Sequence, residues 1–289
     1  MAEKAPTSMS RLPLRFLLLA FIFGSGSKAE PVAWDALHGL NEVKYHKLDR
    51  EGEFTPLHIF VRLPAEYDPT SSATYPTAFL LDGGLMFPVL AGYQRHLELA
   101  EDAPALIVVG ISYGTDDWQK GNARSTDFTD HAPDRDHWGG ASEFLPILLQ
   151  QIIPLVEENY AVDSHQRILF GQSIAGQFVL YTAMHAPDAF HGLIANNPAL
   201  HRNLPVYLAA PSKVDHDSPP RLLVTSGEFD DPRFREPAQK WIKHWTASEK
   251  SPWALRAITT QGHNHFSAAP AAYRHGLRWI LALGQSVGD

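Results

Sequence analysis

Cysteine is absent from all 289 residues of the sequence. A thiol nucleophile, a disulfide framework and a thiolate metal site are therefore excluded. Basic residues are also scarce, since 24 Lys and Arg stand against 32 Asp and Glu, for a formal net charge of −8. A chain of this charge repels nucleic acid and anionic membrane surfaces, so we expect neither as a partner.

Long apolar runs are missing as well, and the run near the N-terminus, residues 16–23, contains only eight residues. A bilayer takes about 20 residues to cross. The run follows two arginines and precedes Ser-Lys-Ala, a small-x-small cleavage pattern, so we expect a signal peptide over residues 1–29. The mature chain, residues 30–289, would then be a single exported domain, periplasmic or secreted, with a net charge of −11 and no membrane attachment. An uncleaved anchor or an ordinary first helix is the alternative.

Apolar strands alternate with helical segments along the rest of the chain. We expect strands at residues 57–64, 77–83, 105–113, 167–171, 190–197, 221–227 and 253–262. We expect helices at residues 142–160, 173–187, 232–248 and 268–284, the first of them kinked at Pro154. This alternation predicts an α/β fold, with a mostly parallel central sheet and helices on both faces. Ligands of such sheets bind at the carboxyl ends of the strands.

A candidate nucleophile lies in the segment RILFGQSIAG, residues 167–176. The turn that presents a nucleophilic serine between a strand and a helix has the pattern G-x-S-x-G. Here Ala175 stands at the last position, and Gly176 follows it. The turn needs small side chains two residues before and two residues after the serine, which Gly171 and Ala175 provide. Ser173 is therefore a candidate nucleophile, and the alternative is one more serine in a glycine-rich loop.

A serine of this kind needs an acid and then a histidine, each after a later strand. The carboxylates that follow strand 221–227 are Glu228, Asp230 and Asp231. Asp230 stands at the G-x-x-D position typical of such loops, and the others fit a solvated acidic turn. The last strand is followed by His263 and His265, which also form an H-x-H pair of the kind that binds metals. No third ligand stands at a suitable spacing, so we expect no metal.

An acyl-transfer site also needs two hydrogen-bond donors for the oxyanion. We expect one from the backbone N–H of Ile174, the residue after the nucleophile. We expect the second from the loop after strand 77–83, at Gly84 or Leu85, because glycine lets the backbone approach a substrate closely. An ordinary strand-to-helix turn is the alternative for this loop.

The polar connection 114–140 is long for a compact domain, which is typical of functional or disordered segments. Arg124 is a candidate for binding an anionic group, or else it forms a structural pair with Asp127. Tyr113 and Trp138 are candidates for stacking on an aromatic ring of the substrate, or else they anchor the loop. Asn197 follows strand 190–197 and is expected near the same cleft.

These segments resemble the Putative esterase (esterase D-like) family of α/β-hydrolases over residues 40–285. The segments that carry the resemblance are LLDGGLMF, VVGISY, the stretch at residues 124–129, GGASEFLPILLQQIIPLVEENY, the Ser173 turn, SGEFDD and NHFSAAPAAYRHGLRWI. The resemblance implies the α/β-hydrolase fold and serine-dependent hydrolysis without a cofactor. Its G-x-x-H-x-S register selects His265, and its acid after GE-x selects Asp230.

The family resemblance also implies the class of substrate, a small-molecule ester. Relatives act on siderophore trilactones of the enterobactin type, on feruloyl and acetyl esters and on other acylated small molecules. The compact size, the export signal and the DGG loop favour a siderophore lactone. An acyltransferase on the same scaffold, or a non-catalytic exported binding protein with this fold, is the alternative. The oligomeric state does not follow from the sequence.

Overall fold

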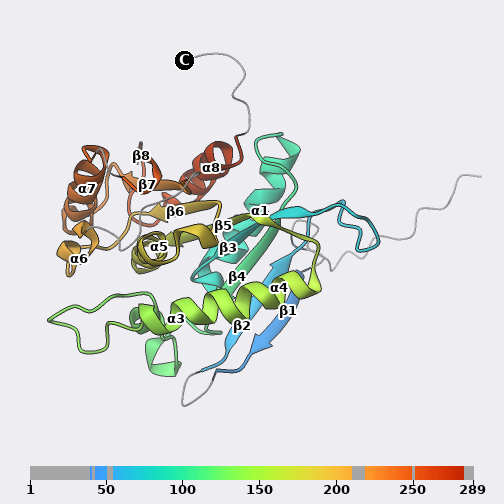
Figure 1. Cartoon of the computed structure of the whole chain (residues 1–289), viewed down its shortest axis with the longest axis horizontal. Coiled ribbons are helices and arrows are strands. Elements are labelled where there is room, and N and C mark those ends of the chain that lie inside the picture. The colour runs from blue at the N-terminus through green and yellow to red at the C-terminus, as the bar shows by residue number, and fades with distance from the viewer. Residues whose placement is uncertain (1–39, 41–42, 51–54, 210–218, 249–250, 283–289) are drawn as a thin grey trace, which may run out of the picture. The chain divides into compact units, whose positions relative to one another are not determined.

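The central sheet has eight strands in the part of the chain that the structure describes, in the order β1-β2-β4-β3-β5-β6-β7-β8 (Figure 1). The computed structural model describes residues 40, 43–50, 55–209, 219–248 and 251–282, which belong to one unit, Leu37–Asp289. The strands are β1 (Val43–Leu48), β2 (Leu57–Arg62), β3 (Tyr75–Leu80), β4 (Ile107–Ser112), β5 (Val162–Gln172), β6 (Gly192–Asn196), β7 (Arg221–Gly227) and β8 (Ala254–Thr260). Strands β3 to β8 pair in parallel, whereas β1 and β2 form antiparallel pairs at one edge. The expected mostly parallel sheet is confirmed.

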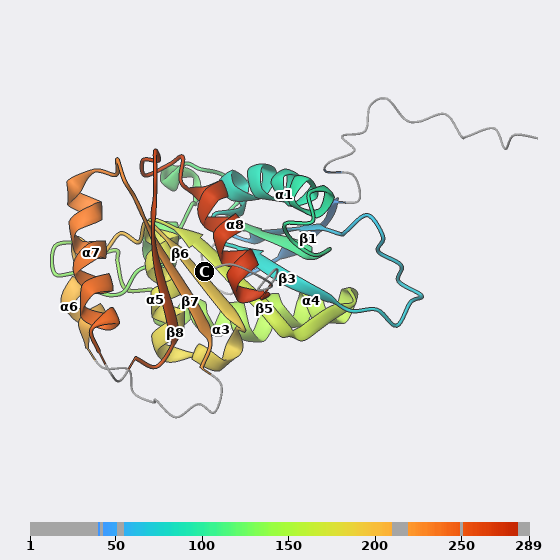
Figure 2. The same cartoon turned by 90° about the horizontal axis from the view of Figure 1, so that it is seen from above.

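Helices cover both faces of the sheet, as the alternation predicted. The helices are α1 (Gly83–Leu99), α2 (Arg124–Asp127), α3 (Ala141–Ile147), α4 (Ile153–Asn159), α5 (Ile174–His185), α6 (Leu204–Leu208), α7 (Pro232–Thr246) and α8 (Ala269–Ile280). Helices α1 and α8 pack on one face, where Leu90 and Leu277 join side chains of β3 and β5 in one buried cluster. Figure 2 shows these two helices along the same side of the sheet. Buried side chains of α3, α4, α5 and α7 form the cluster on the other face.

Strand β1 and helix α1 were not anticipated from the sequence. Strand β1 lies at the edge of the sheet and has no buried residue, so it lacks the apolar alternation that would reveal it. Helix α1 begins with two glycines and contains Pro88, which are poor helix formers. Its buried residues Met86, Leu90 and Leu97 nevertheless recur on one face. The tertiary packing of that face against the sheet outweighs the weak local propensity.

The helix expected at residues 142–160 is interrupted near Pro154, where a kink was predicted. Helices α3 and α4 are joined by a π-helical turn at Leu148–Ile152, and Pro154 is the second residue of α4. Proline has no N–H, so it cannot complete the hydrogen-bond ladder of a continuous α-helix. The backbone widens by one residue before Pro154 instead, and the next helix starts there.

Two residues near the middle of the long connection 114–140 contact buried residues of the fold. Asp127, at the end of α2, accepts hydrogen bonds from Arg50 Nη1 at 2.7 Å and from the Tyr113 hydroxyl at 2.9 Å. The next residue, Phe128, is fully buried, and its ring centroid lies 5.2 Å from that of Phe144. This part of the connection is therefore packed into the fold.

The predicted signal peptide, residues 1–29, lies outside the described residues. Within the described part of the chain, no helix has both the length and the apolar character needed to cross a membrane.

Candidate active site

Ser173 lies on a sharp turn between β5 and α5, at the carboxyl edge of the sheet. Its backbone dihedral angles are φ 60° and ψ −118°, which are strained for any residue other than glycine. Hydrogen bonds hold the turn in place, because the Ser173 N–H donates to the Asn196 carbonyl and its own carbonyl accepts from Gln177 and Ala199. The serine side chain is half-buried at the end of the strand. This is the geometry of a presented nucleophile.

Small residues around the turn allow the helix and the strand to approach each other. A Cβ atom added to Gly171 would clash with the backbone carbonyl of Ala175, so no side chain fits there. Ala175 is fully buried, and the fold accommodates its methyl group. A Cβ atom on Gly176 would lie 2.9 Å from the Asn196 carbonyl oxygen. The departure of Ala175 from the usual glycine therefore leaves the turn intact.

We expect Gly171→Ala to lower kcat by roughly 100-fold, because the added methyl group has to displace the backbone that presents Ser173. The measurement is steady-state hydrolysis of p-nitrophenyl butyrate. Ala175→Gly is the matched control, since it only restores the usual pattern, and its kcat should stay within a few-fold of wild type. A Gly171→Ala enzyme with the wild-type kcat would show that the turn tolerates the displacement.

His265 and Asp230 are in direct contact. His265 Nδ1 lies 3.0 Å from both carboxylate oxygens of Asp230, whose side chain is 1% exposed. A carboxylate only accepts hydrogen bonds, so the proton of the neutral imidazole resides on Nδ1. Nε2 is then free to accept a proton. The Phe234 ring stacks on the imidazole with centroids 4.5 Å apart and restrains its plane.

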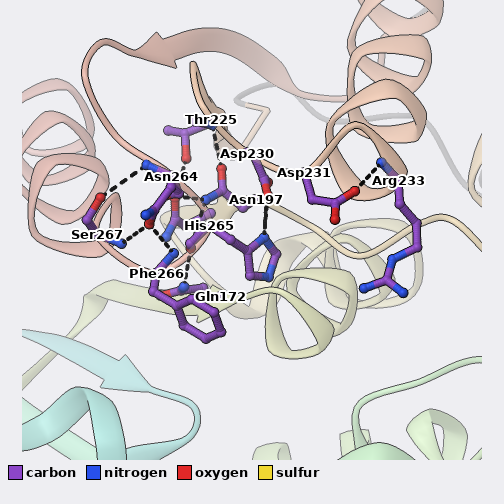
Figure 3. A network of polar contacts seen from close by, with 12 residues as sticks. Gln172, Asn197, Thr225, Asp230, Asp231, Arg233, Asn264, His265, Phe266 and Ser267 are labelled. Carbon is purple, nitrogen blue, oxygen red and sulfur yellow. Dashed lines mark hydrogen bonds and ion pairs between the residues drawn. The ribbon is translucent and has the colours of Figure 1, made fainter.

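The alternative histidine and acids have other partners. His263 Nδ1 hydrogen-bonds the Ser267 hydroxyl at 3.2 Å in an exposed turn. Glu228 accepts a hydrogen bond from the Gly262 N–H at 2.8 Å. Asp231 caps α7 by accepting from the Arg233 N–H at 2.8 Å. Figure 3 shows Asp231 turned toward Arg233 and Asp230 turned toward His265. The geometry therefore favours His265 and Asp230 among the alternatives that the sequence left open.

A cavity of about 640 Å³ lies beside Ser173 and His265. Ser173, His265, Gly84 and Phe266 are among the residues that line it. Within the described residues, no hydrogen bond joins the Ser173 hydroxyl to His265. Such a bond is often long before substrate binds and tightens in the reactive complex. Ser173 and His265 therefore face a common space that an ester can enter.

The expected oxyanion donors lie at two helix N-termini. Ile174 is the first residue of α5, where the N–H has no partner within the helix. Gly84 and Leu85 lie in the first turn of α1 and line the cavity. The Leu85 N–H already donates to the Asp82 carbonyl at 2.9 Å, which makes Gly84 the better second donor.

Within the described part of the chain, no group of three or more metal-ligating side chains is found.

Comparison with known proteins places the chain in a family. Residues 55–269 match the family described as Putative esterase. The chain belongs to this esterase family. It is thus an ester-hydrolysing enzyme, as the sequence predicted.

Individual relatives agree with this assignment. The esterase is 28% identical to the ferri-bacillibactin esterase BesA of Bacillus subtilis over 250 residues, or 78% of this chain and 84% of that protein. The siderophore hydrolase EstB from Aspergillus nidulans has a TM-score of 0.72 at 20% identity and covers 86% of this chain and 98% of its own. The IroE-like serine hydrolase from Shewanella oneidensis has a TM-score of 0.72 at 19% identity, over 86% of this chain and 82% of its own. The expected α/β-hydrolase fold is confirmed.

Arg124 lines the cavity of the esterase, but its charge is already paired. Its Nε and Nη2 atoms donate to the two carboxylate oxygens of Asp82 at 2.8 and 2.7 Å. Burial disfavours the charge of Arg124, but the attraction and hydrogen bonds of Asp82 outweigh it and raise the pKa of the guanidinium. The alternative pair with Asp127 is wrong, because Asp127 binds Arg50 and Tyr113. Arg124 thus binds the side chain of Asp82, two residues before Gly84, as well as facing the cavity.

The aromatic candidates Tyr113 and Trp138 are both buried, and each contacts other side chains of the fold. Tyr113 lines the cavity, but burial, with the nearby charge of Asp127, raises the pKa of its phenol well above the ordinary value. The hydroxyl therefore stays protonated and donates to Asp127. Trp138 is not among the cavity-lining residues, and it packs edge-on against His201 with ring centroids 6.4 Å apart. Its predicted stacking on substrate does not fit this position.

Asn197 also does not line the cavity, although it was expected near the cleft. It is 1% exposed, and both ends of its side-chain amide hydrogen-bond backbone atoms. Sequence reasoning missed Asp82, Gln172, Arg233 and Phe234, which all line the cavity. Asp82 lies two residues before Gly84, and Gln172 directly precedes Ser173. Their places in these two motifs could have identified them as cavity residues. Arg233 and Phe234 belong to α7 and carried no local signal.

Proposed function

We propose that this esterase hydrolyses a small-molecule carboxylic ester through an acyl-enzyme on Ser173. The Ser173 oxygen attacks the ester carbonyl carbon while His265 Nε2 takes its proton. The imidazolium then protonates the departing alcohol as the carbonyl–oxygen bond breaks. Water attacks the acyl-enzyme in the second half of the reaction, and its proton passes to His265 before Ser173 is released. Asp230 keeps Nδ1 protonated and stabilises the imidazolium throughout.

Backbone amides stabilise the tetrahedral intermediates in this proposal. The Ile174 N–H and the Gly84 N–H supply the two hydrogen bonds to the oxyanion, and the Asp82–Arg124 ion pair holds the second of these donors in place. Donors fixed in this way need no reorganisation as charge develops on the oxygen.

A single observation carries the proposal. The imidazole of His265 contacts both oxygens of a buried Asp230 at 3.0 Å and faces the same cavity as a serine held at φ 60°. A backbone strain of this kind persists where the surrounding structure enforces it, and it is concentrated at functional sites.

We propose a siderophore lactone as the ester. Two features support this: the relatives named for bacillibactin and siderophore hydrolysis, and a cavity large enough for a bulky ester. Its rim carries Phe266 at 75% exposure and Leu85 at 53% exposure, which offer apolar contact to a ring that projects from the ester.

Two measurements test the proposal. A fluorophosphonate probe should label Ser173 in the folded protein, as peptide mapping would detect, because only an activated serine reacts. Absence of the label would favour a non-catalytic binding protein. A panel of a trilactone siderophore, a feruloyl ester and p-nitrophenyl butyrate should give the highest kcat/KM for the trilactone. A higher value for the feruloyl ester would overturn the substrate while leaving the chemistry in place.

A further inference from the structure

Two side-chain amides converge on the backbone carbonyl oxygen of His265. Gln172 Nε2 and Asn197 Nδ2 both donate to this oxygen, the latter at 3.0 Å (Figure 3). Gln172 is 4% exposed and Asn197 is 1% exposed, so water competes little for these hydrogen bonds. The catalytic function assigned above uses only the imidazole of His265 and leaves this pair of amides without a role.

The orientation of both amides follows from their partners. A carbonyl oxygen only accepts hydrogen bonds, so each amide must present its N–H₂ group to His265. For Asn197 the opposite end is fixed as well, because its Oδ1 accepts from the Gly227 N–H at 2.7 Å. Asn197 reaches both partners with a left-handed backbone, φ 45°, which asparagine adopts more readily than most residues.

The two amides connect segments that carry different parts of the site. Gln172 is the last residue of β5 and directly precedes Ser173. Asn197 follows β6 and also holds the start of the loop that carries Asp230, through Gly227. The loop around His265 is otherwise exposed, with Phe266 at its surface. Gln172 therefore joins the strand of the nucleophile to the backbone of the base, and Asn197 joins that backbone to the start of the loop of the acid.

Gln172 keeps this contact at a cost in stability. Its Oε1 atom is buried without a hydrogen-bond partner among the described residues. An unpaired buried oxygen is unfavourable, and methionine, with a similar shape and no polar oxygen, would avoid it. A side chain present only to fill space would not need this amide.

We propose that Gln172 and Asn197 are positioning residues that set the distance between His265 and Ser173 through the His265 carbonyl. The inference rests on the proposed function, because it gives the pair a role in the work of His265. Both amides bind the backbone of the base, so we expect their removal to lower kcat far more than it changes KM. Gln172 also lines the cavity, and a methionine there keeps the volume of its side chain.

The primary variant is Gln172→Met, measured with p-nitrophenyl butyrate. We expect kcat to fall on the order of tenfold, since displacements well under 1 Å reduce proton transfer measurably and 1 Å costs about 100-fold. KM should stay within about twofold, and the melting temperature should not fall, because the unpaired Oε1 atom is removed. Asn197→Gly, which keeps the left-handed backbone, is the second variant and should give the same separation of kcat from KM.

Gln166→Met is the matched control. Gln166 lies on the same strand, and its amide donates to Asp163 at a distance from the site. Its kcat should equal that of wild type. A Gln172→Met enzyme with full kcat, or with its loss confined to KM, would overturn the proposal.

A double-mutant experiment tests whether Gln172 acts through His265. In a His265→Ala background, Gln172→Met should leave the residual rate unchanged, because the base that it positions is gone. An equal further loss in that background would show that Gln172 acts by another route. Ser173→Ala separates the two proposals. If this variant retains activity, the proposed function is wrong. If it is inactive while Gln172→Met is fully active, only the positioning role is wrong.

Discussion

Ser173→Ala should lower kcat for p-nitrophenyl butyrate by at least about 10⁴-fold, because removal of a serine nucleophile eliminates the acyl-enzyme route. The residual rate would come from binding and the oxyanion donors alone. The fold should be unaffected, since the serine hydroxyl makes no hydrogen bond with a described residue. Steady-state kinetics and the melting temperature, measured on the same preparation, separate loss of chemistry from loss of structure.

Ser142→Ala provides the control for this experiment. Ser142 is an exposed residue of α3, outside the cavity, and its loss should leave both kcat and the melting temperature at wild-type values. Comparable activity of Ser173→Ala and wild type would rule out Ser173 as the nucleophile, whatever the control shows.

Asp230→Asn should lower kcat by roughly 10³- to 10⁴-fold with little change in KM. The asparagine amide can donate to Nδ1, which favours the tautomer with the proton on Nε2. That tautomer cannot accept the serine proton. The imidazolium also loses the negative charge that stabilises it, so the transition state suffers more than the bound ester.

Glu228→Gln is the matched control for the acid. Glu228 lies two residues away, and its carboxylate holds the Gly262 N–H instead of the histidine. Glutamine keeps an acceptor oxygen for that contact, so kcat should change by less than a few-fold. A larger loss for Glu228→Gln than for Asp230→Asn would contradict the assignment of the acid.

Much of the fold followed from hydrophobic patterns that the structure confirms. The buried strand β4 is a nearly continuous apolar run, which is typical of a strand covered on both faces in a parallel sheet. Strand β1 and helix α1 were missed because one is polar and the other begins with glycines. Their stability comes from neighbours distant in the sequence, which no local pattern reports.

The positions of the candidate site residues were predictable where a residue type and a strand end coincide. Ser173, Asp230 and His265 each follow a strand that could be identified, and parallel strands bring their carboxyl ends to one edge. The orientation of individual side chains could not be predicted in the same way. Asn197 and Trp138 occupy expected places along the chain, but their side chains bind backbone and neighbouring rings instead of facing the cavity. Only the packed structure decides such directions.

The anchoring of connection 114–140 has a consequence for how an ester enters. Thr115, Asn122 and Arg124 from this connection line the cavity, and Asp127 and Phe128 fix its middle in the core. Arg124 also forms an ion pair with Asp82, and both residues line the cavity. We therefore expect residues 115–128 to form a fixed wall of the cavity, so that an ester enters and its products leave without a closure step of this segment. On this expectation, selectivity between esters would come from the shape of this wall as it stands, without induced fit.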